Sequence, residues 1–141
     1  MKKTIKTTIL LLFAFALVLA LVSCNTVKKT GLWEDAEYRK DMEFGKGSKT
    51  VVVEVKAEDE MVSFTIHTDK TTVGAALLEH GLIEGEDSIY GMYVKVVNGM
   101  RADFDEDQSY WGFYIDGELS FTGVDTTEIT EGVTYQLVYT R

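Results

Sequence analysis

An alternation of apolar and polar residues begins at Thr50 and constrains the fold more than any other feature of the chain. Apolar side chains recur at every second position in residues 51–55 and again in residues 62–66, and the acidic run at residues 58–60 separates the two stretches. Because successive side chains of a strand point to opposite faces, this period places the apolar side chains together. The pattern predicts a β-hairpin with one apolar face.

The period changes after this hairpin, in the stretch TTVGAALLEHGL at residues 71–82. Four of its residues share one helical stripe: Val73, Ala76, Leu77 and His80. Thr71 or Thr72 can cap the start of a helix, and Gly81 stands where helices commonly end. The stretch predicts a short helix of about two to three turns.

Further strands are expected after the helix. They are residues 90–97, 110–115 and 133–140. Asn98-Gly99 and Asp116-Gly117 are strong signals for two-residue hairpin turns. This order predicts an α+β domain of the β-grasp type, with a hairpin, one short helix on one face, and further strands on a single mixed sheet. Another α+β sandwich is the alternative fold.

The start of the chain has the features of an export signal. Residues 1–8 are basic, residues 9–22 form a continuous apolar run, and small residues precede Cys24. The sequence Leu-Val-Ser-Cys that ends at Cys24 resembles a bacterial lipobox, whose cysteine is acylated and becomes the new N-terminus. A plain signal peptide or a membrane-spanning anchor, with Cys24 incidental, is the alternative.

The expected domain organisation follows from these signals. We expect a lipoprotein signal peptide at residues 1–23, then the lipidated Cys24 with a tether and an irregular N-terminal arm at residues 24–49, and the β-grasp domain at residues 50–141. Two acyl chains hold a protein firmly on a bilayer. The protein is therefore expected on the extracytoplasmic face of a bacterial cell membrane.

The charge of the chain limits its partners. Without the three signal-peptide lysines, 11 basic side chains remain against 23 acidic ones, a net charge of about −12. Such a balance argues against nucleic acid, and also against a domain that lies flat on an anionic membrane. Cys24 is the only cysteine, so no disulfide can form within the chain, and a lipidated sulfur cannot serve as a nucleophile.

The stretch YWGFYIDG at residues 110–117 carries aromatic side chains on both faces of one expected strand. Trp111 and Phe113 point one way, whereas Tyr110 and Tyr114 point the other, and a single helix can cover only one face. Either the N-terminal arm or the loop at residues 103–109 buries the second face, or this face stays open. An open aromatic face would form a platform for a flat ligand or a protein partner.

Residues 72–140 resemble the transcobalamin-like C-terminal domain family. The matching segments are TVGAALLEHGLIEG, YGMYVKVVNGMRADF, SYWGFYIDGE, GVDTTEITEG and TYQLVYT. The resemblance implies a β-grasp domain that forms one wall of a ligand pocket, over one side of a corrin ring. Carried over to this chain, it implies a wall built around Tyr110, Trp111 and Phe113, with Gly123 and Val124 beside them.

The chain departs from the animal cobalamin carriers because it lacks their large helical domain, which forms the second wall. A single wall is expected to bind weakly, at micromolar affinity or worse, since a good pocket buries most of its ligand. A second chain or a transporter component is then needed to complete the pocket. No covalently bound cofactor is expected, and a corrinoid is expected only as a ligand.

Metal binding and catalysis are not indicated by the residues. His67 and His80 have no further ligand at metal spacing, and no Ser/His/Asp set can be argued from them. The stretch DFDEDQS at residues 103–109 begins like a calcium loop, but Gln108 and Tyr114 occupy the positions that need Gly and a bidentate Glu. We expect no metal site, and we do not expect an enzyme.

The sequence therefore favours a membrane-anchored lipoprotein whose domain captures a small ring-shaped ligand, such as a corrinoid, on its aromatic strand, for uptake. The alternative is a cell-surface protein-interaction module without a small-molecule ligand.

Overall fold

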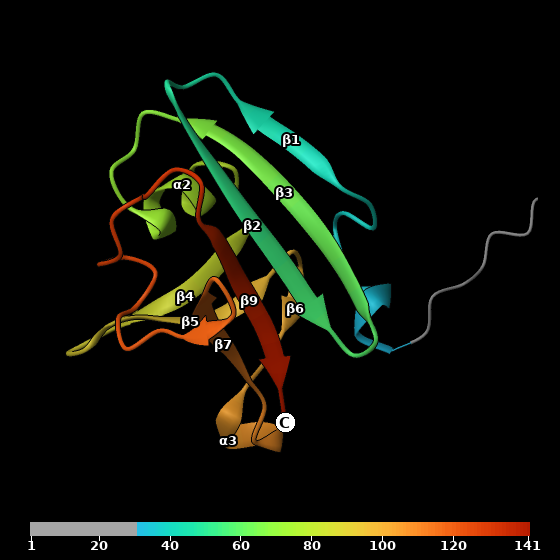
Figure 1. Cartoon of the computed structure of the whole chain (residues 1–141). Coiled ribbons are helices and arrows are strands. Elements are labelled where there is room, and N and C mark those ends of the chain that lie inside the picture. The colour runs from blue at the N-terminus through green and yellow to red at the C-terminus, as the bar shows by residue number, and fades with distance from the viewer. Residues whose placement is uncertain (1–30) are drawn as a thin grey trace, which may run out of the picture.

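The computed structural model describes residues 31–141. The predictions of a signal peptide and of a lipidated Cys24 lie outside these residues. Among the residues that it describes, no helix is long and apolar enough to cross a membrane. The described elements are mainly strands, arranged in two sheets (Figure 1).

The predicted hairpin consists of β2 (Lys49–Ala57) and β3 (Glu60–Thr68). Its antiparallel register pairs Val53 with Phe64 and Val55 with Val62, so the apolar side chains of both strands share one face. These side chains are buried, whereas the alternate residues are partly exposed. The alternation in the sequence thus correctly predicted which side chains of this hairpin are buried.

The last strand, β9 (Thr134–Thr140), lies parallel to β2 in the centre of the large sheet (Figure 1). On the other side of β9 lies β7 (Tyr110–Ile115), which pairs antiparallel with it, and then the short edge strand β8 (Glu118–Leu119). The order of this sheet is β1-β3-β2-β9-β7-β8. An initial hairpin, a helix, and a parallel central pair of the first hairpin strand, β2, with the last strand, β9, confirm the α+β class and the β-grasp arrangement.

The strands do not form the single mixed sheet that was expected. A separate three-stranded sheet contains β4 (Ile83–Ser88), β5 (Gly91–Val97) and β6 (Met100–Arg101). The β4 strand buries only its first residue, so its sequence has no alternation to reveal it. Because β3 and β9 fill the positions beside β2, and β7 fills the position beyond β9, β5 pairs with β4 and forms a second layer instead.

The helix α2 (Val73–Glu79) begins where the sequence indicated. The hydroxyl oxygen of Thr72 accepts a hydrogen bond from the backbone N–H of Ala75 at 3.3 Å, and Gly81 takes a positive φ of 65° just after the end. The buried residues of α2 and of the small sheet join those of the large sheet in one core, so both cover the same face of the large sheet (Figure 1).

The N-terminal arm is more regular than expected. It contains a 3-10 turn, η1 (Gly31–Glu34), and an edge strand, β1 (Met42–Gly45), which pairs parallel with β3. The indole of Trp33 is fully buried, and its N–H donates a hydrogen bond to the carbonyl oxygen of Ala57 at 2.9 Å. The arm therefore packs onto the domain and extends its large sheet.

Candidate functional site

Both residues in the middle of β7 that were predicted to bind a ligand lie in the core. Trp111 is 7% exposed and Phe113 is 9% exposed. The ring of Phe113 stacks on that of Tyr135 at 6.0 Å between centroids, and Trp111 meets Tyr139 edge to face at 5.6 Å. These side chains hold β7 against β9 and present little surface to a ligand.

The other three predicted residues are spread over the strand and its neighbours. Tyr110 is partly exposed at the start of β7, whereas Val124 is buried and its carbonyl oxygen accepts the N–H of Gly74 at 2.7 Å. Gly123 precedes it in the same loop and has no side chain. The five residues thus do not form one continuous exposed wall.

The N-terminal arm does not cover the second face of β7. Its Trp33 bonds to Ala57, and its Phe44 packs edge to face on Phe64 at 5.6 Å, so both contact the core side of the β2–β3 hairpin. Residues 103–109, expected as a loop, contain a short helical turn, α3 (Phe104–Asp107). Exposed apolar side chains remain at both ends of β7, in two hollows.

The first hollow lies at the turn after β7, and we call it the hairpin groove. It has a volume of about 660 Å³ and is lined by Ile115, Asp116, Glu118, Leu119, Ser120, Phe121 and Thr122. The side chain of Phe121 is 100% exposed and that of Leu119 is 55% exposed. No other described large apolar residue is as exposed as Phe121.

Local structure explains the shape of the hairpin groove. Asp116 and Gly117 both take positive φ, of 49° and 84°, and so form the tight turn that the sequence predicted. Ile115 then pairs with Glu118 and Tyr114 with Leu119, and the pairing of β7 with β8 ends there. The chain bends away after Ser120, whose hydroxyl donates to the carbonyl oxygen of Thr122 at 3.0 Å. This bend leaves Phe121 outside the sheet.

The second hollow lies at the other end of β7, and we call it the aromatic cleft. Its volume is about 440 Å³, and it is lined by Tyr93, Lys95, Asp103, Phe104, Asp105 and Tyr110. The three rings come from β5, α3 and β7, and each is between 38% and 55% exposed. The sequence prediction missed Phe104, because this single aromatic residue stands in an acidic run that suggests a solvated loop.

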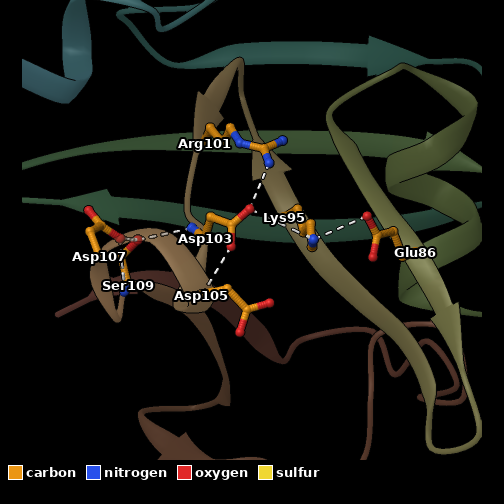
Figure 2. A network of polar contacts seen from close by, with 7 residues as sticks. All are labelled: Glu86, Lys95, Arg101, Asp103, Asp105, Asp107 and Ser109. Atoms are coloured by element: carbon orange, nitrogen blue, oxygen red, sulfur yellow. Dashed lines mark hydrogen bonds and ion pairs between the residues drawn. The ribbon is translucent and has the colours of Figure 1, made fainter.

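A polar network joins three residues that line the aromatic cleft, Lys95, Asp103 and Asp105, to Glu86 and Arg101 (Figure 2). The ammonium of Lys95 lies 3.1 Å from a carboxylate oxygen of Glu86 and 3.8 Å from one of Asp103. Arg101 donates to the same Asp103 oxygen at 2.7 Å, and the backbone N–H of Asp105 donates to the other at 3.1 Å. Asp103, which is almost buried, is thereby bonded on both oxygens.

These contacts shift the pKa values of the network. Burial alone would raise the pKa of Asp103, but the N–H of Asp105 and the charges of Lys95 and Arg101 outweigh it, so the pKa lies below its usual range. The hydrogen bond with Glu86 is the main cause of the raised pKa of Lys95. The hydroxyl and N–H of Ser109 lower the pKa of Asp107. These three groups are therefore charged at neutral pH.

The two histidines lie near a third hollow, of about 260 Å³. His67 bonds through Nε2 to Glu43 at 2.7 Å, and the ring of His80 stacks on Phe44 at 5.4 Å between centroids. The Nε2 atom of His80 is 3.8 Å from a carboxylate oxygen of Glu79. Within residues 31–141, no three His, Cys, Asp or Glu side chains gather as a metal site would require.

Comparisons with known proteins place this geometry in a wider context. The model of a family described as a domain of unknown function, DUF4430, matches residues 70–140. The crystal structure of a candidate metal-binding protein from Ruminococcus gnavus ATCC 29149 is similar to this structure, with a TM-score of 0.63. The two sequences are 28% identical, and the alignment covers 67% of this chain and 98% of that one.

A second solved structure is haptocorrin in complex with Cbi, which is 18% identical with a TM-score of 0.48. That likeness covers 70% of this chain and 26% of haptocorrin, so the chain corresponds to about a quarter of that protein. No curated protein matches the chain. Since the family model covers half of the sequence, the chain belongs to the DUF4430 family of domains of unknown function.

Proposed function

We propose that the protein is a lipid-anchored, extracytoplasmic ligand-binding protein that captures a small ring-bearing molecule at the hairpin groove. The observation that carries this proposal is the complete exposure of Phe121 beside the half-exposed Leu119 in an open hollow. Exposed apolar surface rimmed by polar side chains commonly marks a binding site. Asp116, Glu118 and Thr122 supply such a rim.

The energetics favour a flat, largely apolar ligand. Covering an exposed Phe side chain stabilises a complex by about 1.5–3 kcal/mol, and ring stacking adds about 0.5–1.5 kcal/mol. The volume of the hairpin groove, about 660 Å³, lies within the usual range for small-molecule sites. Because it is open to solvent on one side, it covers only part of a ligand, and we expect a dissociation constant of roughly micromolar or weaker.

Corrinoids are the first candidate ligands, on the strength of the resemblance of residues 72–140 to transcobalamin-like domains. The buried Trp111 and Phe113 then act indirectly, since they fix the strand that carries the hairpin. Gly123 and Val124 follow the hairpin groove in the chain, and the carbonyl oxygen of Val124 anchors their loop to α2. A second chain or a transporter component would cover the exposed side of the ligand and receive it for uptake.

Calorimetric titration of the full chain in an uncharged detergent tests this proposal. Cobinamide and cobalamin are the ligands, and we expect Phe121→Ala to weaken binding about tenfold and Leu119→Ala to weaken it less. Met61→Ala is the matched control, because Met61 is also a half-exposed apolar side chain but lies in β3, away from the hairpin groove. Equal affinities in all variants, or no heat with either corrinoid, would count against corrinoid capture at this site.

A protein-interaction function is the second candidate, because β8 is a sheet edge. It has two residues, pairs with no strand other than β7 within residues 31–141, and carries the exposed Leu119. A strand of a partner protein could add to this edge and cover Phe121. In that case corrinoids give no heat, whereas Phe121→Ala still weakens the binding of the protein partner.

A further inference from the structure

We propose that the aromatic cleft is a second binding site, which takes a small organic cation whose charge lies on a quaternary ammonium group. The aromatic cleft and the hairpin groove lie at opposite ends of β7 and share no lining residue. This inference therefore does not depend on the proposed corrinoid function, and each can fail without the other.

The walls of the aromatic cleft suit a cation. Tyr93, Phe104 and Tyr110 present three partly exposed rings to one hollow. The face of an aromatic ring carries negative electrostatic potential and attracts a cation held within about 6 Å of its centre. One such contact already exists, since the ammonium of Lys95 lies 5.9 Å from the centroid of Tyr93. The three rings come from separate elements and line the same hollow.

The charges around the aromatic cleft favour a cation over an anion. Its lining contains the carboxylates of Asp103 and Asp105 and the ammonium of Lys95. The contacts of Lys95 with Glu86 and Asp103 already neutralise that ammonium (Figure 2). The carboxylate of Asp105 differs from those of Glu86 and Asp103, because it has no hydrogen bond or ion pair within the described part of the chain. Only the backbone N–H of Asp105 is bonded, to Asp103. This exposed carboxylate can balance the charge of a ligand.

The small number of free hydrogen-bond acceptors favours a quaternary ammonium over a primary one. A primary ammonium loses hydrogen bonds to water on entry and needs several acceptors to replace them. Both oxygens of Asp103 are already engaged, so the carboxylate of Asp105 and the hydroxyls of Tyr93 and Tyr110 are the acceptors that remain in the lining. A quaternary ammonium has no N–H and is recognised in other proteins by aromatic cages of this composition. The net charge of −9 also raises the local concentration of cations near the surface.

Choline and its uncharged carbon isostere, 3,3-dimethylbutan-1-ol, provide the test, with the full chain in an uncharged detergent. Proton NMR follows the N-methyl resonance of choline, which we expect to shift upfield as the methyl groups enter the aromatic cleft. Calorimetry supplies the affinities. Choline should bind at least about fivefold more tightly than the isostere, because the isostere lacks the charge that the rings and Asp105 attract.

Two variants locate the site. Phe104→Ala and Asp105→Asn should each weaken choline binding about two- to fivefold, and both side chains are exposed enough for the fold to survive their change. Phe121→Ala and Asp87→Asn are the controls, since they remove an exposed ring and an exposed carboxylate elsewhere. The proposal is overturned by equal binding of choline and the isostere, by unchanged affinity in Asp105→Asn, or by no shift at roughly tens of millimolar choline.

Discussion

At the scale of single residues, Trp33 and Trp111 are both buried but differ in the partners of their indole N–H groups. That of Trp33 donates to the carbonyl oxygen of Ala57, whereas that of Trp111 has no acceptor among residues 31–141. Trp33→Phe should lower the free energy of unfolding by about 0.5–1.5 kcal/mol, because the buried hydrogen bond to the carbonyl oxygen of Ala57 is lost. Trp111→Phe removes a donor that has no acceptor, so it should lower the free energy of unfolding by less than Trp33→Phe does.

Urea unfolding of both variants, followed by far-ultraviolet circular dichroism, measures this difference. Because each variant keeps an aromatic ring, the loss of packing is similar in the two cases. An equal loss of stability would mean that the N–H of Trp111 bonds to an ordered water. The same pair shows the limit of the site prediction. The two-residue period correctly grouped Trp111 with Phe113, but with aromatics on both faces it could not tell which face is buried.

At the scale of secondary-structure elements, α2 depends on a close contact with the loop that contains Val124. The N–H of Gly74 donates to the carbonyl oxygen of Val124 at 2.7 Å, and a Cβ atom at Gly74 would lie 2.9 Å from the backbone of this loop. Helix propensity predicts that Gly74→Ala stabilises α2 by about 1 kcal/mol. The contact predicts the opposite, a net loss of stability, because backbone atoms on both sides must move.

Chemical denaturation of Gly74→Ala decides between these expectations. Ala75→Gly is the control, since it changes propensity in the same helix at a partly exposed position, and should cost about 1 kcal/mol. If Gly74→Ala is more stable than the unchanged protein, the close contact of α2 with Val124 does not constrain the fold.

Elements were predictable where local signals were strong. The hairpin of β2 and β3, the cap at Thr72 and both Gly-containing turns follow from alternation and turn chemistry. The small sheet was not predictable as a separate layer, because β4 lacks alternation and its pairing with β5 depends on the whole topology. Asn98 was predicted only as a turn residue, yet its buried side chain also bonds to both the backbone N–H and the carbonyl oxygen of Tyr38.

At the scale of the whole molecule, the first described residues, around Gly31, lie far from the hairpin groove. The segment around Gly31 lies beside the turn between β2 and β3 (Figure 1). In the sheet order, β1 occupies one edge and β8 the opposite edge. A lipid anchor on the N-terminal side of residue 31 would therefore leave Phe121 and its hairpin groove accessible, which agrees with capture of a ligand from outside the cell.

This arrangement predicts that the anchor and the binding sites are separable. Cells that express the full chain and are fed radiolabelled palmitate should incorporate label into the protein, and Cys24→Ser should incorporate none, because Cys24 is the only cysteine. The affinities of the Cys24→Ser protein for choline and for corrinoids should match those of the unchanged protein. An unlabelled wild-type protein would show that residues 1–23 are a plain signal peptide or a spanning anchor, whereas label retained in Cys24→Ser would place the lipid on another residue.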